Sequence, residues 1–323
     1  MSEEKLNALS AGRSSPASDL FRGIVTVGAL MYAATRIPII GVFFSLLIPV
    51  VILFYRLRLG QRVGGLIPAA AFAAMALALG EASFEMLFFT ELLLLGFVMG
   101  ELFERDLPVE KTVLLTCGIV IGSGILCLAA YSSLSGIGTG EMVSGYVDRN
   151  LQMTLAIYEE VGMGEEMIRA ISESLAAIHF FLVRVLPSLA ITSALFIAWT
   201  TLIMVRPLAH RFGLAYPEFG RLNRWRAPEW LVWGVIASGI ILLLPDKGIR
   251  MVGVNGLILL MMVYFLNGIA IVSFFLEKKQ LPRVMRIGIY LFIALQQLAL
   301  FLVIGIGLFD IWFNFRKLET TKE

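Results

Sequence analysis

The sequence predicts an all-α fold: a polytopic transmembrane helical bundle of about nine spans, with an amphipathic helical insertion on its outer face. Hydrophobic residues make up 59% of the 323 residues and charged residues 15%, against roughly 45–50% and about 25% in soluble domains. Single soluble cores stop growing at about 250–300 residues, so one such core could not bury this much apolar surface. Long charge-free runs recur along the chain, and one acidic segment separates two groups of them.

Nine apolar runs account for the predicted spans, because a helix needs about 20 apolar residues to cross the hydrocarbon. Six runs are free of charge and long enough, namely 39–55, 63–80, 112–131, 185–205, 251–276 and 287–309. Three runs are weaker: 230–245 is short, 86–100 is interrupted by Glu91, and 23–35 ends at Arg36. We therefore predict nine spans, of which 23–35 is the shortest.

These runs divide the chain into five parts. Two membrane bundles, 23–131 with about five spans and 184–311 with about four, flank an extracytoplasmic amphipathic segment, 132–183. Polar tails, 1–22 and 312–323, precede and follow them.

The segment 132–183 is too acidic to cross a membrane. Within it Met167, Ile171, Leu175 and Ile178 recur at helical spacing, which is typical of an amphipathic helix. We predict one or two such helices on the outer face, the last running into the next span near Pro187.

The distribution of Lys and Arg predicts the orientation. With the N-terminus inside, the inner segments hold 17 of the 26 basic residues and the outer segments hold nine. Cytoplasmic loops carry the excess of basic residues, so we predict a cytoplasmic N-terminus and an outer C-terminus in a bacterial cytoplasmic membrane. Arg316 and Lys317 are the local exception, because this topology places them outside.

Motifs for enzymatic chemistry are missing from the sequence. It has no phosphate-binding Gly-rich loop ending in Lys-Ser/Thr, no His-Glu-x-x-His and no Gly-x-Ser-x-Gly, the patterns of common nucleotide, zinc and serine sites. The two histidines, His179 and His210, lie outside the charge-free runs. The net charge of +2 does not indicate a nucleic-acid partner. We expect no catalysis, no cofactor and no bound metal.

Four polar residues inside predicted spans form a candidate intramembrane site. Glu91 lies near the middle of its span, where a carboxylate is costly and should face the bundle interior or water. It is either a proton- or ligand-binding group or a neutral hydrogen-bonding strut. Asn267, Gln296 and Gln297 lie near the centres of the last two spans, where amides usually bridge helices. A shared cavity would make them a binding site instead.

The densest polar motif is a loop rich in Arg and Trp just before the seventh span. Interleaved guanidinium and indole groups suit the lipid headgroup zone. The loop is therefore either a headgroup anchor or a docking surface for a cytoplasmic partner. Its residues are Arg221, Asn223, Arg224, Trp225, Arg226, Pro228 and Trp230.

Two Gly-x-x-x-Gly patterns, at Gly96 and Gly100 and at Gly118 and Gly122, allow helix backbones to approach closely. We expect them to serve packing within the protein.

Three motifs resemble hallmarks of a single membrane protein family. They are the octapeptide 223–230, the run 264–270 followed by Phe274-Phe275, and the ending 307–316, which holds Asp310, Trp312 and Arg316. In this order they are similar to those of the YybS-like membrane family (domain of unknown function 2232). The resemblance covers most of the chain and implies membership of the family, but no particular activity.

The N-terminal half also resembles the substrate-binding S components of energy-coupling-factor transporters, through Ala29-x-x-x-Ala33 and Arg36-Ile37-Pro38. That likeness implies docking of the first helix to a membrane coupling subunit. Those proteins have six spans and lack the outer insertion.

Taken together, the sequence favours a non-enzymatic, substrate-binding or permease-like component that handles a small solute. The alternative is a membrane scaffold or assembly protein that docks a partner through the inner Arg/Trp loop. The direction in which the intramembrane polar side chains point distinguishes the two.

Overall fold

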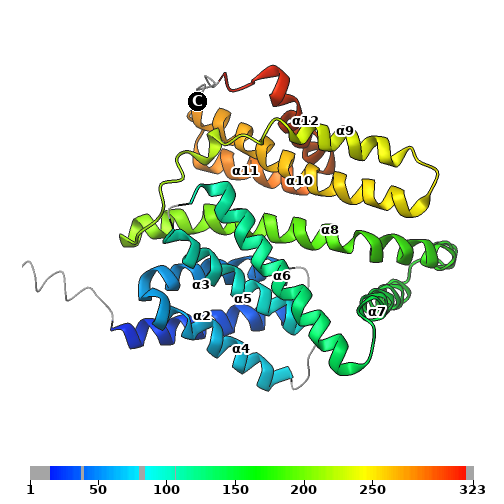
Figure 1. Ribbon diagram of the computed structural model, residues 1–323, viewed down its shortest axis with the longest axis horizontal. Helices are drawn as coiled ribbons and strands as arrows, with labels where there is room; N and C mark the ends of the chain where they lie inside the picture. Colours follow the sequence, from blue (N-terminus) through cyan, green and yellow to red (C-terminus); the bar gives the residue numbers. More distant parts are fainter. Residues whose placement is uncertain (1–14, 38–39, 80–83, 106, 318–323) are drawn as a thin grey trace, which may run out of the picture. The chain divides into compact units, whose positions relative to one another are not determined.

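The computed structural model describes residues 15–37, 40–79, 84–105 and 107–317, and the regular structure of these residues is entirely helical. Figure 1 shows the helices α2 to α12. A short 3-10 turn, η1, lies between α8 and α9. The all-α fold class is confirmed. The chain divides into two compact units: Met1–Ser135 with Ser193–Glu218, and Gly136–Thr192 with Phe219–Glu323.

The first unit includes the N-terminal helices. They are α2 (Pro16–Arg36), α3 (Gly41–Gly64), α4 (Leu66–Leu79), α5 (Phe84–Phe103) and α6 (Val109–Ser135). The last part of α8 (Glu165–Phe212) belongs to the same unit. The predicted division after residue 131 therefore lies close to the observed boundary, but residues 193–218, predicted in the second bundle, join the first unit.

Helix α2 begins earlier than predicted. The Ser15 side chain accepts a hydrogen bond from the Ser18 amide, and Pro16 occupies the first turn, where its missing N–H costs nothing. The predicted tail 1–22 therefore ends too late; residues 1–14 lie outside the described residues.

Helix α3 packs against α2 and α5, and glycine permits its contact with α5. A Cβ atom at Gly96 would overlap Pro49 and Ile52 of α3, and one at Gly100 would overlap the Arg56 side chain. The prediction that this glycine pair serves internal packing is confirmed. Gly118 and Gly122, in contrast, face open space in the structure.

The second unit is built around α10 (Lys247–Lys278). Its other helices are α7 (Thr139–Glu160), the first part of α8, η1 (Leu222–Arg224), α9 (Leu231–Leu242), α11 (Arg283–Leu295) and α12 (Gln297–Phe313). Helices α9 and α12 both pack on α10. The closest approach to α12 is between Gly268 and Gly307, where a Cβ on either glycine would overlap backbone atoms of the other helix.

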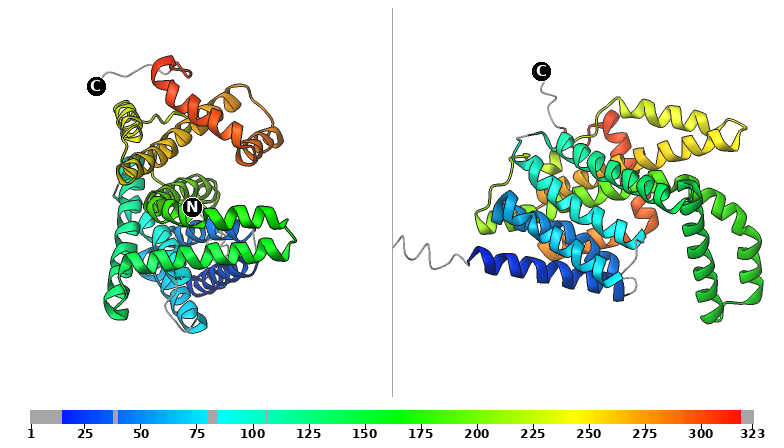
Figure 2. Two further views of the ribbon diagram at one scale, coloured as in Figure 1. Left: turned by 90° about the vertical axis from the view of Figure 1, so that its right-hand side faces the viewer. Right: turned by 60° about the horizontal axis from the view of Figure 1, so that its bottom comes forward.

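The acidic segment forms two helices, as predicted. Figure 2 shows α7 beside the first part of α8, joined by a tight turn. The Ser144 hydroxyl lies 3.1 Å from the His179 ring nitrogen Nε2 across this hairpin. Helix α8 continues through Pro187 without a break, so the prediction that the amphipathic helix runs into the next span is confirmed.

Membrane-spanning length separates the helices into two groups. Among the described residues, α3, α5, α6, α8 and α10 are long and apolar enough to cross a membrane; α11 and α12, bent by 101°, would add a sixth span if they form one. Helices α4 and α9, with 14 and 12 residues, reach only about 21 and 18 Å at 1.5 Å per residue. The predicted count of nine spans is therefore not confirmed.

The predicted last span, 287–309, is wrong as a continuous helix. Gln296 has an extended backbone, φ −102° and ψ 108°, and separates α11 from α12. Both Gln296 and Gln297 are exposed at this break. They do not bridge helices at the centre of a span.

Candidate functional site

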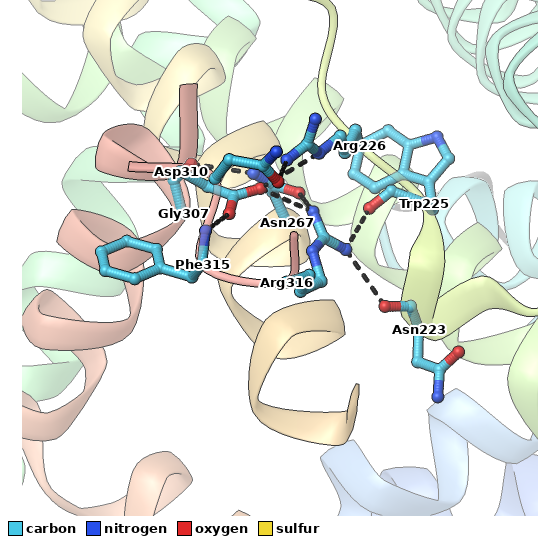
Figure 3. A network of polar contacts seen from close by, with 9 residues as sticks. Asn223, Trp225, Arg226, Asn267, Gly307, Asp310, Phe315 and Arg316 are labelled. Carbon is cyan, nitrogen blue, oxygen red and sulfur yellow. Dashed lines mark hydrogen bonds and ion pairs between the residues drawn. The ribbon is translucent and has the colours of Figure 1, made fainter. Parts of the chain in front are cut away.

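A buried ion pair lies at the end of α12. The Arg316 Nη2 atom is 2.8 Å from Asp310 Oδ2, and the two side chains are 0% and 2% exposed. The chain reverses between them because Asn314 adopts a left-handed conformation, φ 41°. The Phe315 amide then donates to Asp310 Oδ1 at 2.9 Å. Asp310 thus both ends the helix and holds the guanidinium (Figure 3).

Arg316 also binds the segment that precedes α9. Its Nη1 atom donates to the carbonyl oxygens of Asn223 and Trp225, at 3.0 and 2.7 Å. This segment is not helical apart from the single turn η1, so its carbonyls need partners outside the segment. A buried guanidinium supplies them, and Arg316 holds the Arg/Trp loop in place. The prediction that Arg316 lies outside while this loop lies inside is therefore wrong, because the two are in direct contact.

Asn267 links the network to the middle of α10. Its amide nitrogen donates to the Gly307 carbonyl at 2.8 Å, and its amide oxygen accepts from Arg316 Nη2 at 3.0 Å. The residue is 2% exposed and lies within the charge-free run of α10. The structure therefore confirms the prediction that this amide bridges helices.

Arg226 completes the network from the loop. Its Nε atom is 3.4 Å from Asp310 Oδ2, and its Nη2 atom donates to the Asn314 side chain. Nε itself makes no hydrogen bond. A small hollow beside it is lined by Arg226, Ala227, Glu229, Asn267, Asp310 and Ile311.

The charges in this network are unbalanced. Two guanidinium groups share one buried carboxylate. Burial lowers the pKa of Arg316, and the hydrogen bond and charge of Asp310 oppose that change; the guanidinium stays charged at neutral pH. Removing one partner of a buried ion pair typically costs about 3–5 kcal/mol, because a buried charge is left uncompensated.

The structure thus joins three sets of residues that the sequence left separate: Asn267, the Arg/Trp loop and the C-terminal signature. Other members of these sets point outward. Arg221, Arg224, Pro228, Trp230 and Trp312 are exposed. Arg221 lies 3.8 Å from Glu277 of α10, whose carboxylate also accepts from the Asn223 amide.

Glu91 occupies a separate position in the first unit. It lies between α5 and α6, where the Ser123 hydroxyl is 3.1 and 3.0 Å from its two carboxylate oxygens. The same hydroxyl is 2.7 Å from the Val120 carbonyl. Glu91 is half-buried and contacts a neighbouring helix, as the strut interpretation predicts.

A second ionic cluster was not predicted. Arg56 of α3 is 1% exposed, and its guanidinium is 2.6 Å from Glu101 of α5 and 2.9 Å from Glu104, which follows α5. Gln61 donates to Glu101 at 2.9 Å. From the sequence, Arg56 was predicted only as one of the inner basic residues. The sequence did place one arginine directly after the predicted span 39–55 and two acids directly after the predicted span 86–100. This pattern is compatible with an ion pair between the two spans.

Comparisons with known proteins bear on the family alone. Within the described residues, no group of three or more His, Cys, Asp or Glu side chains is placed to hold a metal ion. No curated protein and no solved structure gives a significant match. A family model described as "Predicted membrane protein (DUF2232)" matches residues 25–311, which are most of the chain. The protein therefore belongs to this family of membrane proteins, as its three sequence motifs indicated.

Proposed function

We propose that the protein is a non-enzymatic, multi-pass component of small-solute transport in a bacterial cytoplasmic membrane. The observation that carries the proposal is a buried network that joins the Arg/Trp loop to α10 and α12. Its members are Asp310, Arg316, Arg226 and Asn267. Charged side chains in membrane segments are costly and usually mark a solute or ion pathway.

Interrupted helices in the same unit as the network support the same function. Helix α9 is short and preceded by a non-helical segment, and α11 and α12 meet at a 101° break. Irregular backbone within a membrane is tolerated where protein buries it or where it lines a cavity. In transporters such discontinuous helices supply the groups that bind solutes and coupling ions.

Arg226 is the member of the network with capacity to contact a solute. The four guanidinium hydrogen bonds of Arg316 all go to protein atoms. The Nε atoms of both arginines lack a hydrogen-bond partner, but the Arg226 side chain is 29% exposed and lines the hollow, whereas that of Arg316 is 0% exposed. The hollow is small, so solute binding requires the loop to move away from α10.

A ligand screen on the full chain tests this proposal. The purified protein is heated in mild detergent with a panel of anionic, cationic, zwitterionic and neutral small metabolites, and the unfolding temperature is recorded. A solute at 100 times its Kd stabilises a protein by about 2.7 kcal/mol. We expect a solute that stabilises the wild type and Arg224→Gln but not Arg226→Gln. Absence of any stabilising solute, or equal stabilisation of both variants, contradicts the proposal.

A scaffold function is the second candidate, and the loop geometry favours it. Arg316 binds the Asn223 and Trp225 carbonyls of the loop. Other side chains of the same segment remain exposed, namely Arg221, Arg224 and Trp230. A segment ordered in this way presents its outward side chains at little entropic cost. Mild-detergent purification followed by mass spectrometry distinguishes the functions. Bound solute or a membrane coupling subunit supports transport, whereas a stoichiometric non-transport partner lost on Arg224→Glu supports the scaffold.

A further inference from the structure

Exposed basic side chains gather where α10 ends. Lys278 and Lys279 close the helix, and Arg283 begins α11 after a short turn. The Arg/Trp loop reaches the same place, because Asn223 and Arg221 contact Glu277. Arg224 is exposed on that loop.

This basic end, which we define as Arg221, Arg224, Lys278, Lys279 and Arg283, carries a local excess of positive charge. Among the described residues, Glu277 is the acid that contacts the basic end. The Glu277 carboxylate already binds Asn223 and Arg221. Within the described residues, no ion pair is formed by Arg224, Lys278, Lys279 or Arg283. Four cationic groups are therefore available to an external anion.

Exposed apolar side chains lie directly beside these cations in the chain. Val284, Met285 and Ile287 follow Arg283 on α11 and are 81, 52 and 59% exposed. Trp230 and Trp233 follow the loop and are 69 and 70% exposed. Cations next to exposed aliphatic and indole groups match the headgroup and the acyl chain of a phospholipid.

We propose that the basic end of the second unit is a binding site for anionic phospholipid, selective over zwitterionic phospholipid. Clusters of four to eight Lys and Arg beside a membrane span are typical of such sites. An acidic protein would match the charges but not the exposed apolar side chains of α11. The inference does not depend on solute transport.

The lipid site is tested by native mass spectrometry of the full-length protein. The chain is reconstituted in nanodiscs that contain equal amounts of phosphatidylglycerol and phosphatidylethanolamine, and the lipids retained after gentle release are counted. The site variant is Arg224→Gln, Lys278→Gln, Lys279→Gln. The matched control is Lys247→Gln, Arg149→Gln, Arg169→Gln, which removes three exposed charges elsewhere in the same unit.

We expect the wild type and the control to retain several-fold more phosphatidylglycerol than phosphatidylethanolamine. One basic residue near an anionic surface changes binding by about fivefold, so the site variant should lose most of the preference. Higher salt should weaken retention in the wild type, because the groups are exposed. Equal retention of both lipids by the wild type overturns the proposal. So does an unchanged preference in the site variant.

Discussion

Arg316 and Asp310 lie six residues apart and form an ion pair of 2.8 Å, with neither side chain more than 2% exposed. The pair holds the residues that follow α12 against the last turn of that helix. The Nη1 atom of Arg316 then donates to the Asn223 and Trp225 carbonyls. The C-terminal residues are therefore part of the folded core of the second unit. The predicted polar tail, 312–323, begins too early, because α12 continues to Phe313 and Arg316 is buried.

Arg226 and Arg224 should differ in their effect on stability, although they are two residues apart. Arg226→Gln removes a charge that contacts Asp310 and Asn314, and we expect it to cost about 1–3 kcal/mol of unfolding free energy. Arg224 is exposed, and Arg224→Gln should change stability by less than about 0.5 kcal/mol. Denaturation in mixed detergent micelles measures both. Equal losses would show that Arg226 does not act through the network.

Gly307 should not tolerate a larger side chain. Gly307→Ala places a methyl group against the Tyr264 carbonyl and the Gly268 amide, and overpacking of this kind costs about 1–3 kcal/mol. Gly305→Ala is the matched control in the same helix, because nothing lies within 4 Å of its Cβ position. The control should keep or slightly raise the unfolding temperature, since alanine favours helix. If both variants unfold at the same temperature, α10 and α12 do not pack as described.

Glu91 should act as a hydrogen-bonding strut between α5 and α6. Glu91→Gln keeps an oxygen for the Ser123 hydroxyl and should preserve stability, whereas Glu91→Leu leaves that contact unmade and should cost about 1–3 kcal/mol. Thermal unfolding compares the two. A Glu91→Leu protein as stable as the wild type would argue against the strut. A folded Glu91→Gln protein without transport activity would instead support a proton- or solute-binding role.

The predicted orientation can be tested with single cysteines. Glu159→Cys on α7 should react with a membrane-impermeant maleimide in intact cells, and Glu218→Cys should react only after permeabilisation, because 17 of the 26 basic residues lie on the segments predicted to be inside. Cys117→Ala and Cys127→Ala provide the background, since Cys127 is exposed. The reverse labelling pattern would invert the topology.

Hydropathy was sufficient to predict the long helices. The run 251–276 became α10, Lys247–Lys278, and its additional first turn follows from Asp246, whose side chain accepts from the Ile249 amide. The run 86–100 became α5, Phe84–Phe103. The first stretch is charge-free and long enough to define a spanning helix from composition alone; the second is shorter and contains Glu91, yet its apolar residues on both sides of Glu91 were sufficient to predict the helix.

Breaks and long-range pairs could not be predicted in this way. Gln296 interrupts a run with no Gly or Pro at the break, so the local sequence carried no stop signal. Arg316 binds carbonyl groups 93 and 91 residues earlier in the chain. Its basic charge was visible, but its partners are set by the tertiary packing of α12 on α10. The candidate site was therefore predicted as separate residues, and the structure joined them.

A double-mutant cycle on the Asp310–Arg316 ion pair tests the buried network most directly. Asp310→Asn, Arg316→Gln and the double variant are unfolded in mixed micelles, and the unfolding free energies are compared. Each single variant leaves an unpaired charge and should lose about 3–5 kcal/mol. The double variant should lose less than the sum, with a coupling energy of about 1–3 kcal/mol. Losses that add to within about 0.5 kcal/mol would contradict a coupled, buried pair.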